Sequence, residues 1–194
     1  MIFVRSLLFI ALFLASLVVL LVAGFTAIRG QSSRAIGILR SYFLCAGLYL
    51  GTVVVVSAFS PRRVVGMGEP RCFDDWCIAV EGVQRVPMEN GTSYVAKLRV
   101  YSTARRVSQR ENNVVAYVTD DRGIRYDPIG DRSTVPLNVL LLPQQSVATD
   151  RIFHLPADSR PVGIVIGHQG GFPISWFIIG DEAWFHKPAI VPIQ

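Results

Sequence analysis

The chain has 194 residues with a mean hydropathy of +0.42, and only 17% of its residues are charged. The first 60 residues hold four arginines and no acidic residue, whereas all 14 acidic residues and the other basic residues follow. The sequence pI of 9.4 is therefore not the signature of a nucleic-acid-binding protein, because the chain beyond residue 60 is almost neutral. The high apolar content throughout also excludes intrinsic disorder.

Two uncharged apolar stretches predict membrane-spanning helices at about 6–28 and 41–60. A helix of about 20 apolar residues crosses a hydrocarbon core of about 30 Å. A cleaved signal peptide is the alternative for the first stretch. That stretch is longer than the usual apolar region of about 7–15 residues, and no clear A-x-A cleavage site follows it. We therefore expect residues 1–60 to be a membrane anchor formed by a transmembrane helical hairpin.

The connector between the two stretches, residues 29–40, indicates the orientation of the hairpin. It carries Arg29, Arg34 and Arg40 and no acidic residue. Short loops rich in arginine and lysine stay in the cytoplasm, so both chain ends are expected on the opposite side. The predicted location is the cell membrane, with a multi-pass chain whose C-terminal domain lies outside the cytoplasm.

Gly47 and Gly51 form a small-xxx-small pattern on the second apolar stretch. Such a pattern lets another helix approach closely, and the first helix is the nearest candidate. The alternative is that glycine is simply frequent in membrane helices. We retain helix packing as a hypothesis for this pair.

Residues 61–71 contain Pro61, Gly66, Gly68 and Pro70 without apolar periodicity, which is typical of a linker. The chain from 72 to 194 then shows short strand signals separated by turn residues and no convincing helix. The predicted strands are 78–86, 94–102, 113–119, 124–126, 135–142, 147–155, 162–168 and 175–179. So many short strands in about 120 residues favour an all-β, immunoglobulin-like antiparallel sandwich.

Alternation of apolar and polar residues predicts which side chains meet in the core of this sandwich. Lys97 and Arg99 should face solvent, and Trp76 or Trp176 should add aromatic volume to the core. Six aliphatic and aromatic residues, at alternate positions on three strands, should meet between the sheets: Leu98, Val100, Phe153, Leu155, Ile164 and Ile166.

Three segments carry a resemblance to a known family. They are Thr119-Asp120-Asp121-Arg122-Gly123-Ile124-Arg125-Tyr126-Asp127-Pro128, Leu142-Pro143-Gln144-Gln145-Ser146-Val147-Ala148-Thr149 and Ile152-Phe153-His154-Leu155-Pro156. Together they resemble the telokin-like, immunoglobulin-type sandwich domains of bacterial extracytoplasmic proteins, many of unknown function. The ending from Ile179 to Pro188 is similar to the last strand of such domains. The resemblance implies a fold and no catalytic residues. The chain departs from it where the usual glycine of the Pro-x-x-Ser turn is glutamine.

Cys72 and Cys77 bracket four residues just before the first strand. Outside the cytoplasm, two cysteines at this spacing close a small disulfide loop. A zinc site would need four ligands, and no second cysteine pair exists. The spacing also differs from the C-x-x-C of redox-active pairs. We expect a structural disulfide between them.

The remaining chemistry-bearing residues give no recognisable site. His154, His168 and His186 lie on separate segments, and the glycine-rich loop 167–172 has no helix after it to cradle a phosphate. Four arginines gather near one strand end and could meet anionic headgroups or an acidic glycan, although a solvated face is the simpler interpretation. They are Arg99, Arg105, Arg106 and Arg110. The sequence predicts no catalytic, cofactor-binding or metal-ligating residues.

The function that these patterns favour is a non-enzymatic, membrane-anchored interaction module. Its partners would be the lipid bilayer and a membrane or envelope protein, with no nucleic acid and no cofactor. The alternative is a small-ligand or metal-binding accessory subunit of an envelope complex. A pocket joining His168 and His186 would favour the alternative, whereas a closed sandwich with an exposed apolar patch would favour the module.

Overall fold

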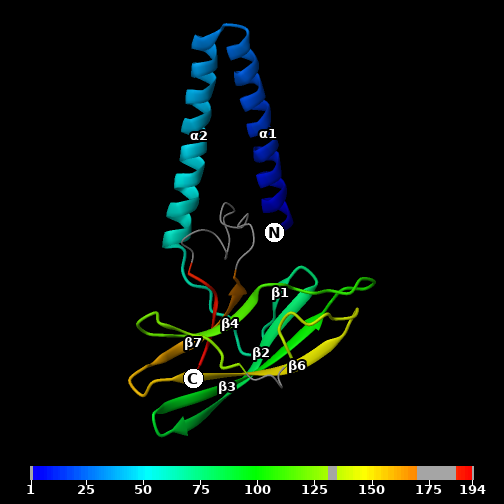
Figure 1. Cartoon of the computed structure of the whole chain (residues 1–194), viewed down its shortest axis with the longest axis vertical. Coiled ribbons are helices and arrows are strands. Elements are labelled where there is room, and N and C mark those ends of the chain that lie inside the picture. The colour runs from blue at the N-terminus through cyan, green and yellow to red at the C-terminus, as the bar shows by residue number, and fades with distance from the viewer. Residues whose placement is uncertain (1, 131–134, 170–186, 194) are drawn as a thin grey trace. The chain divides into compact units, whose positions relative to one another are not determined.

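The computed structural model describes residues 2–130, 135–169 and 187–193 and divides the chain into two units. One unit contains two helices, and the other, which begins at Arg62, contains the strands. The predicted fold class is confirmed: two apolar helices precede a sandwich of antiparallel sheets. Figure 1 shows both units.

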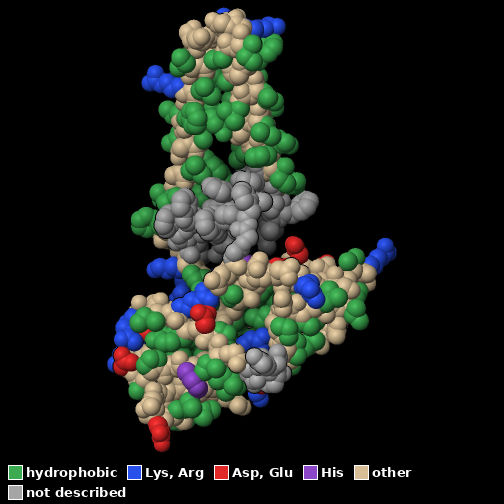
Figure 2. All heavy atoms as spheres, viewed as in Figure 1, with side chains coloured by type: hydrophobic (Ala, Val, Ile, Leu, Met, Phe, Trp, Pro, Cys, Tyr) green, Lys and Arg blue, Asp and Glu red, His purple; other side chains and the backbone are tan. Residues whose placement is uncertain are grey.

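The helical unit consists of α1 (Ile2–Ile28) and α2 (Ser32–Phe59), joined by a tight turn. Gly30 takes a positive φ of 75° there, a conformation that suits a residue without a Cβ. Ile10–Ile28 and Ser32–Phe59 are both long and apolar enough to cross a membrane. Figure 2 shows hydrophobic side chains over the visible surface of both helices.

The second helix begins nine residues earlier than the sequence predicted, at Ser32 rather than at residue 41. The arginines at the two ends of an uncharged stretch show where its apolar composition ends. The helix itself can extend further, because backbone hydrogen bonding does not depend on apolar side chains. Serine and arginine are compatible with a helix, so the helix continues through Arg34 and Arg40 to the turn. The connector is reduced to Arg29, Gly30 and Gln31.

Gly47 and Gly51 do not pack against α1. Both residues are exposed, and a Cβ built on either would meet nothing within 4 Å. The two helices do contact each other, and Ala23 on α1 and Ala35 on α2 are both buried. The structure therefore shows no contact of α1 with the glycine pair. Packing against some other helix stays a prediction for this pair.

The sandwich has two four-stranded sheets in the described part of the chain. The first has the order β1-β2-β3-β6 and the second β5-β4-β7-β8, with every neighbouring pair antiparallel. The strands are β1 (Arg71–Phe73), β2 (Trp76–Met88), β3 (Gly91–Ser102), β4 (Val114–Asp120), β5 (Arg125–Tyr126), β6 (Ser146–Leu155), β7 (Pro161–His168) and β8 (Ile190–Pro192).

The core lies between these sheets and matches the predicted alternation. All six predicted core residues are at most 4% exposed and belong to one buried cluster, together with Trp76. Lys97 is exposed, and the side chain of Arg99 is 43% exposed and paired with Glu81. Trp176 lies outside the described residues. The strand register inferred for β3, β6 and β7 is confirmed.

Two parts of the strand prediction need correction. Residues 135–142 form turns instead of a strand, with one bridge between Leu141 and Gln109. Pro136 and Pro143 interrupt this apolar run because proline lacks the N–H that a sheet ladder requires. The segment 175–179 lies outside the described residues, as does most of the ending likened to a last strand. The last described strand is Ile190–Pro192.

The predicted linker is bonded to the sandwich. Val64 forms a parallel bridge with Ile190, and the N–H of Val65 donates to the carbonyl of Ile190 at 2.9 Å. Val65 is buried in the core, and the N–H of Gly68 donates to the carbonyl of Val80. These contacts show that the sandwich starts at about residue 62. The sequence predicted a linker here because the segment has no apolar periodicity, but such a segment can still pair with a sheet edge.

Candidate interaction surface

An open groove lies at the tip of the hairpin formed by β2 and β3. It is lined by residues 86–92 of the hairpin and residues 154–156 at the end of β6. Pairing of β2 with β3 continues to Met88 opposite Gly91, so Glu89 and Asn90 form the turn. The register of β3 with β6 places Thr92 opposite Leu155 and Ser93 opposite His154. We call this end of the sandwich the hairpin end.

A β-bulge directs apolar side chains into this groove. Val80 pairs with Leu98, but Gly82 pairs with Lys97, so one extra residue shifts the alternation of β2 between them. Before the bulge, β2 residues with even numbers face the core, whereas afterwards they face outward. Val86 and Met88 are consequently 46% and 52% exposed.

Close backbone contact fixes the floor of the groove. Gly91 has a φ of 147°, and a Cβ at this position would lie 2.2 Å from the carbonyl oxygen of Leu155. Only glycine allows this approach of the hairpin to the end of β6. The groove is thus held by backbone geometry rather than by mobile side chains.

The outer edge of β2 beside the groove is largely open. β1 pairs only with residues 76–78 of β2, and among described residues the next backbone bond on that side is the one that Gly68 donates to Val80. Backbone donors and acceptors beyond Val80 can therefore accept an added strand. Arg85 and Pro87 discourage indiscriminate pairing there.

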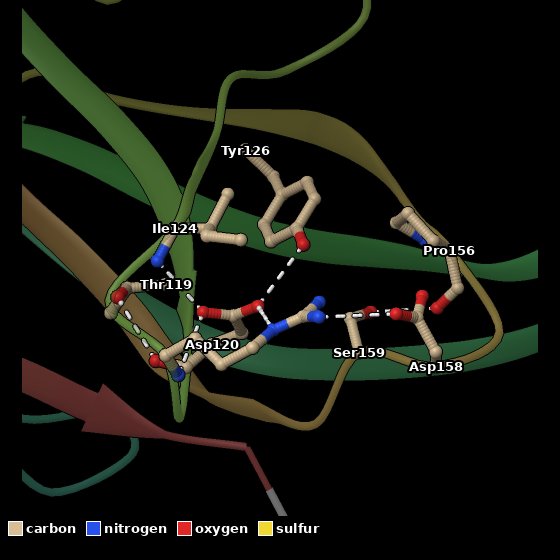
Figure 3. Close-up of polar contacts among 8 residues, drawn as sticks. Thr119, Asp120, Ile124, Tyr126, Pro156, Asp158 and Ser159 are labelled. Carbon is tan, nitrogen blue, oxygen red and sulfur yellow. Dashed lines mark hydrogen bonds and ion pairs between the residues drawn. The ribbon is translucent and has the colours of Figure 1, made fainter.

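A buried carboxylate also organises the hairpin end. Asp120 closes β4, and its side chain is fully buried. It accepts hydrogen bonds from the N–H of Ile124 at 2.7 Å, the N–H of Arg122 at 3.0 Å and the hydroxyl of Tyr126 at 3.1 Å. The guanidinium of Arg122 bonds Asp120 at 3.2 Å and reaches Asp158 at 3.1 Å (Figure 3). This network ties the β4–β5 turn to the β6–β7 turn.

The donors around Asp120 decide its charge. Burial alone would raise the pKa of this carboxyl, because it disfavours the charged form. The hydrogen bonds from Ile124, Tyr126 and Arg122, with the charge of Arg122, outweigh burial and hold the pKa of Asp120 below its ordinary range. Asp120 is therefore a satisfied structural anion at neutral pH rather than a proton donor or acceptor.

The opposite end of the sandwich carries the predicted disulfide, and we call it the disulfide end. Cys72 and Cys77 lie directly opposite each other on β1 and β2 and are bonded. The carbonyl of Asp75, in the turn between them, accepts a hydrogen bond from the N–H of Thr103 at 2.8 Å. The disulfide hairpin is thereby connected to the loop that follows β3.

The described histidines do not converge. His168 Nε2 lies 3.0 Å from Glu111 Oε1, and its ring contacts Phe73 at the disulfide end. His154 lies at the hairpin end, and His186 is outside the described residues. Among described residues no group of three or more histidine, cysteine or acidic side chains is placed to hold a metal ion.

Comparisons with known proteins find no matching protein-family model and no matching curated protein. The chain is similar to the crystal structure of MPT63, a secreted protein from Mycobacterium tuberculosis, with 12% identity and a TM-score of 0.43 over 58% of this chain and 93% of that chain. It is also similar to an uncharacterised β-sandwich protein from Clostridium difficile 630. That match has 10% identity and a TM-score of 0.43 over 70% of this chain and 96% of that chain.

Proposed function

We propose that this chain is a membrane-anchored, extracytoplasmic interaction module whose sandwich binds a protein partner at the hairpin end. The two apolar helices support the anchor as a multi-pass hairpin, and the sandwich is the part presented outside the cytoplasm. The proposal includes kinship with the telokin-like, immunoglobulin-type domains that the sequence resembles. It assigns no enzymatic activity.

The observation that carries the proposal is the pair of exposed apolar side chains, Val86 and Met88, that line the groove. An exposed apolar cluster is costly to keep in water and is typical of an interaction site. The open edge of β2 next to it supplies backbone hydrogen bonds. The occupant we propose is an extended segment of an envelope protein that adds along β2 and places an apolar side chain in the groove.

Site-specific photocrosslinking in intact cells tests this proposal. A photoreactive residue at Val86 should yield one defined crosslinked product, and Met88→Glu in the same chain should abolish it. The matched control is Ile129, which is also 46% exposed and is bridged to Ile152 of β6 but does not line the groove. Equal products from Val86 and Ile129, or a product at Val86 that survives Met88→Glu, would refute a docking site at the hairpin end.

A further inference from the structure

The loops at the disulfide end expose apolar and basic side chains together. Val107, Leu140 and Leu142 are 65%, 49% and 58% exposed. Arg105, Arg106 and Arg110 are also exposed, and none of these arginines forms an ion pair with another described residue. Figure 2 shows hydrophobic and basic side chains side by side at the end of the sandwich that the loop after β3 reaches in Figure 1.

Hydrogen bonds hold these loops in place, so the apolar side chains cannot collapse inward. Gln109 and Leu141 exchange both backbone bonds at 2.8 Å, and Leu141 is fully buried. Its neighbours Leu140 and Leu142, on either side of this bridge, are exposed. The side chain of Gln144 donates to the carbonyls of Thr103 and Ala104 at 3.1 and 3.0 Å, which joins the two loops.

Gln144 contributes to this turn through both its backbone and its side chain. Its φ is 62°, a left-handed conformation that glycine adopts most easily. Glutamine at this position accepts the strain, and its amide provides the two bonds to the loop after β3. The loop platform at the disulfide end therefore depends on a side chain that glycine would lack.

The arginines at the two ends of the sandwich differ in whether they pair with acidic side chains. At the hairpin end, Arg122 binds Asp120 and Asp158, so its charge is neutralised internally. At the disulfide end the nearby acids are Asp74, Asp75 and Glu111. Among these, Asp75 interacts with Thr103 and Glu111 with His168. No ion pair joins any of these acids to the three arginines in the described part of the chain, so the arginines can meet an external anion.

The chain enters the sandwich at the disulfide end. Helix α2 ends at Phe59, and the sandwich unit begins at Arg62. Residues 63–65 then run parallel to β8. Strand β8 starts nearer to the His168 end of β7 and runs toward the start of β7. The first segment of the sandwich therefore runs from the disulfide end toward the hairpin end.

From these observations we propose that the disulfide end docks on an anionic lipid surface. The guanidinium groups of Arg105, Arg106 and Arg110 meet lipid phosphates, and the side chains of Val107, Leu140 and Leu142 enter the headgroup region. This inference rests on the proposed membrane anchor. It adds a second, peripheral contact that restrains the sandwich and leaves the hairpin end free for its partner.

Fluorescence of the full chain in vesicles tests this docking. An environment-sensitive dye is attached to Val107→Cys or, as a control, to Met88→Cys, each with Cys45→Ala so that one free thiol remains. The vesicles contain phosphatidylcholine alone or with phosphatidylglycerol, and lipids with a nitroxide near the headgroup act as quenchers. The dye at Val107 should be quenched only in the anionic vesicles, and the dye at Met88 in neither.

Changes in salt and charge should have defined effects. Raising the salt from about 0.01 M to about 1 M shortens the Debye length from about 30 Å to about 3 Å and should abolish the quenching. Each of Arg105→Gln, Arg106→Gln and Arg110→Gln should lower the docked population about fivefold. Quenching that ignores salt and lipid charge, or a dye at Val107 as unquenched as the one at Met88, would overturn the proposal.

A dye on the native Cys45 separates this inference from the proposed function. Cys45 lies within α2, so in an anchored chain its dye should be quenched by nitroxides on the acyl chains. Quenching at Cys45 without quenching at Val107 would remove only the lipid docking of the sandwich. No quenching at Cys45 would remove the membrane anchor and the proposed function with it.

Discussion

Asp120 shows how a single residue links stability to pH. Because its pKa in the folded state lies below its unfolded value of about 3.9, the carboxylate favours folding fully above that pH. When the pH falls below the pKa of Asp120 in the folded state, the carboxyl is protonated in both the folded and the unfolded protein. Its contribution to stability then disappears. Asp120→Asn should therefore destabilise the protein at neutral pH and flatten the loss of stability below about pH 4.

Thermal unfolding of the two proteins between neutral and acidic pH measures this effect. Asp127→Asn is the matched control, because Asp127 also pairs with an arginine but its side chain is 62% exposed. Exposed ion pairs contribute little to folding. If the Asp120 and Asp127 variants show the same pH profile, the buried network has no special role.

The core makes a second prediction at the scale of single residues. Phe153 is fully buried, so Phe153→Ala leaves a cavity and should lower the free energy of unfolding by about 3–5 kcal/mol. Arg99 is half exposed and makes a surface pair with Glu81, so Arg99→Ala should cost less than about 1 kcal/mol. Denaturant unfolding measures both, and similar losses would contradict the register of β3 and β6.

Among the elements, the hairpin of β1 and β2 depends on its disulfide. The bond closes a small loop, because the two cysteines are only five positions apart. In the chain-entropy model such a loop contributes about 2 kcal/mol. Cys72→Ala combined with Cys77→Ala should therefore lower stability by about that amount, and Cys45→Ala should have no effect. Mass spectrometry of unreduced protein should show Cys72 linked to Cys77, and two alkylatable thiols there would contradict the pairing.

The strands that could be predicted from the sequence are those with regular alternation and a buried face. β3, β6 and β7 have both features, so their positions and inward side chains followed from periodicity. β1 and β8 have three residues each, which is too short for a period to be visible. Residues 135–142 are apolar because they cover an end of the core, and apolarity alone does not distinguish such a loop from a strand.

The groove at the hairpin end could not be predicted in this way. Val86 and Met88 continue the alternation of Ile78 and Val80, which by itself predicts that all four face the core. The bulge between Val80 and Gly82 reverses the later pair, and Gly82 is its only trace in the sequence. Residues 154–156, which complete the groove, are far away in sequence, and the resemblance of their segment to telokin-like domains predicts a fold and no binding site.

At the scale of the whole molecule, the two units differ in the polarity of their surfaces. The helices expose large apolar side chains, such as Leu21 at 73% and Phe43 at 65%, which water would not tolerate but lipid would. The described part of the sandwich instead buries a large apolar cluster between two sheets and exposes apolar side chains such as Met88 and Val107 near its ends. A chain divided in this way suits a boundary between bilayer and water, as the proposed function requires.

The orientation across that boundary is the last prediction. The turn of three residues is followed closely by Arg34 and Arg40, and no acidic residue offsets the arginines. Retention of basic turns in the cytoplasm places both chain ends outside. Arg62 and Arg63 oppose this, but they precede a long domain, and long domains are translocated largely regardless of charge.

Reporter fusions measure this orientation. A reporter active only in the cytoplasm should work when inserted at Gly30 and should be silent when fused after Gln194. Replacing Arg29, Arg34 and Arg40 with glutamate should weaken this preference, because it removes the positive charge that retains the turn. The reverse pattern in the unmodified chain would place the sandwich in the cytoplasm. Thiols there are kept reduced, so the disulfide of β1 and β2 and the extracytoplasmic role would be lost together.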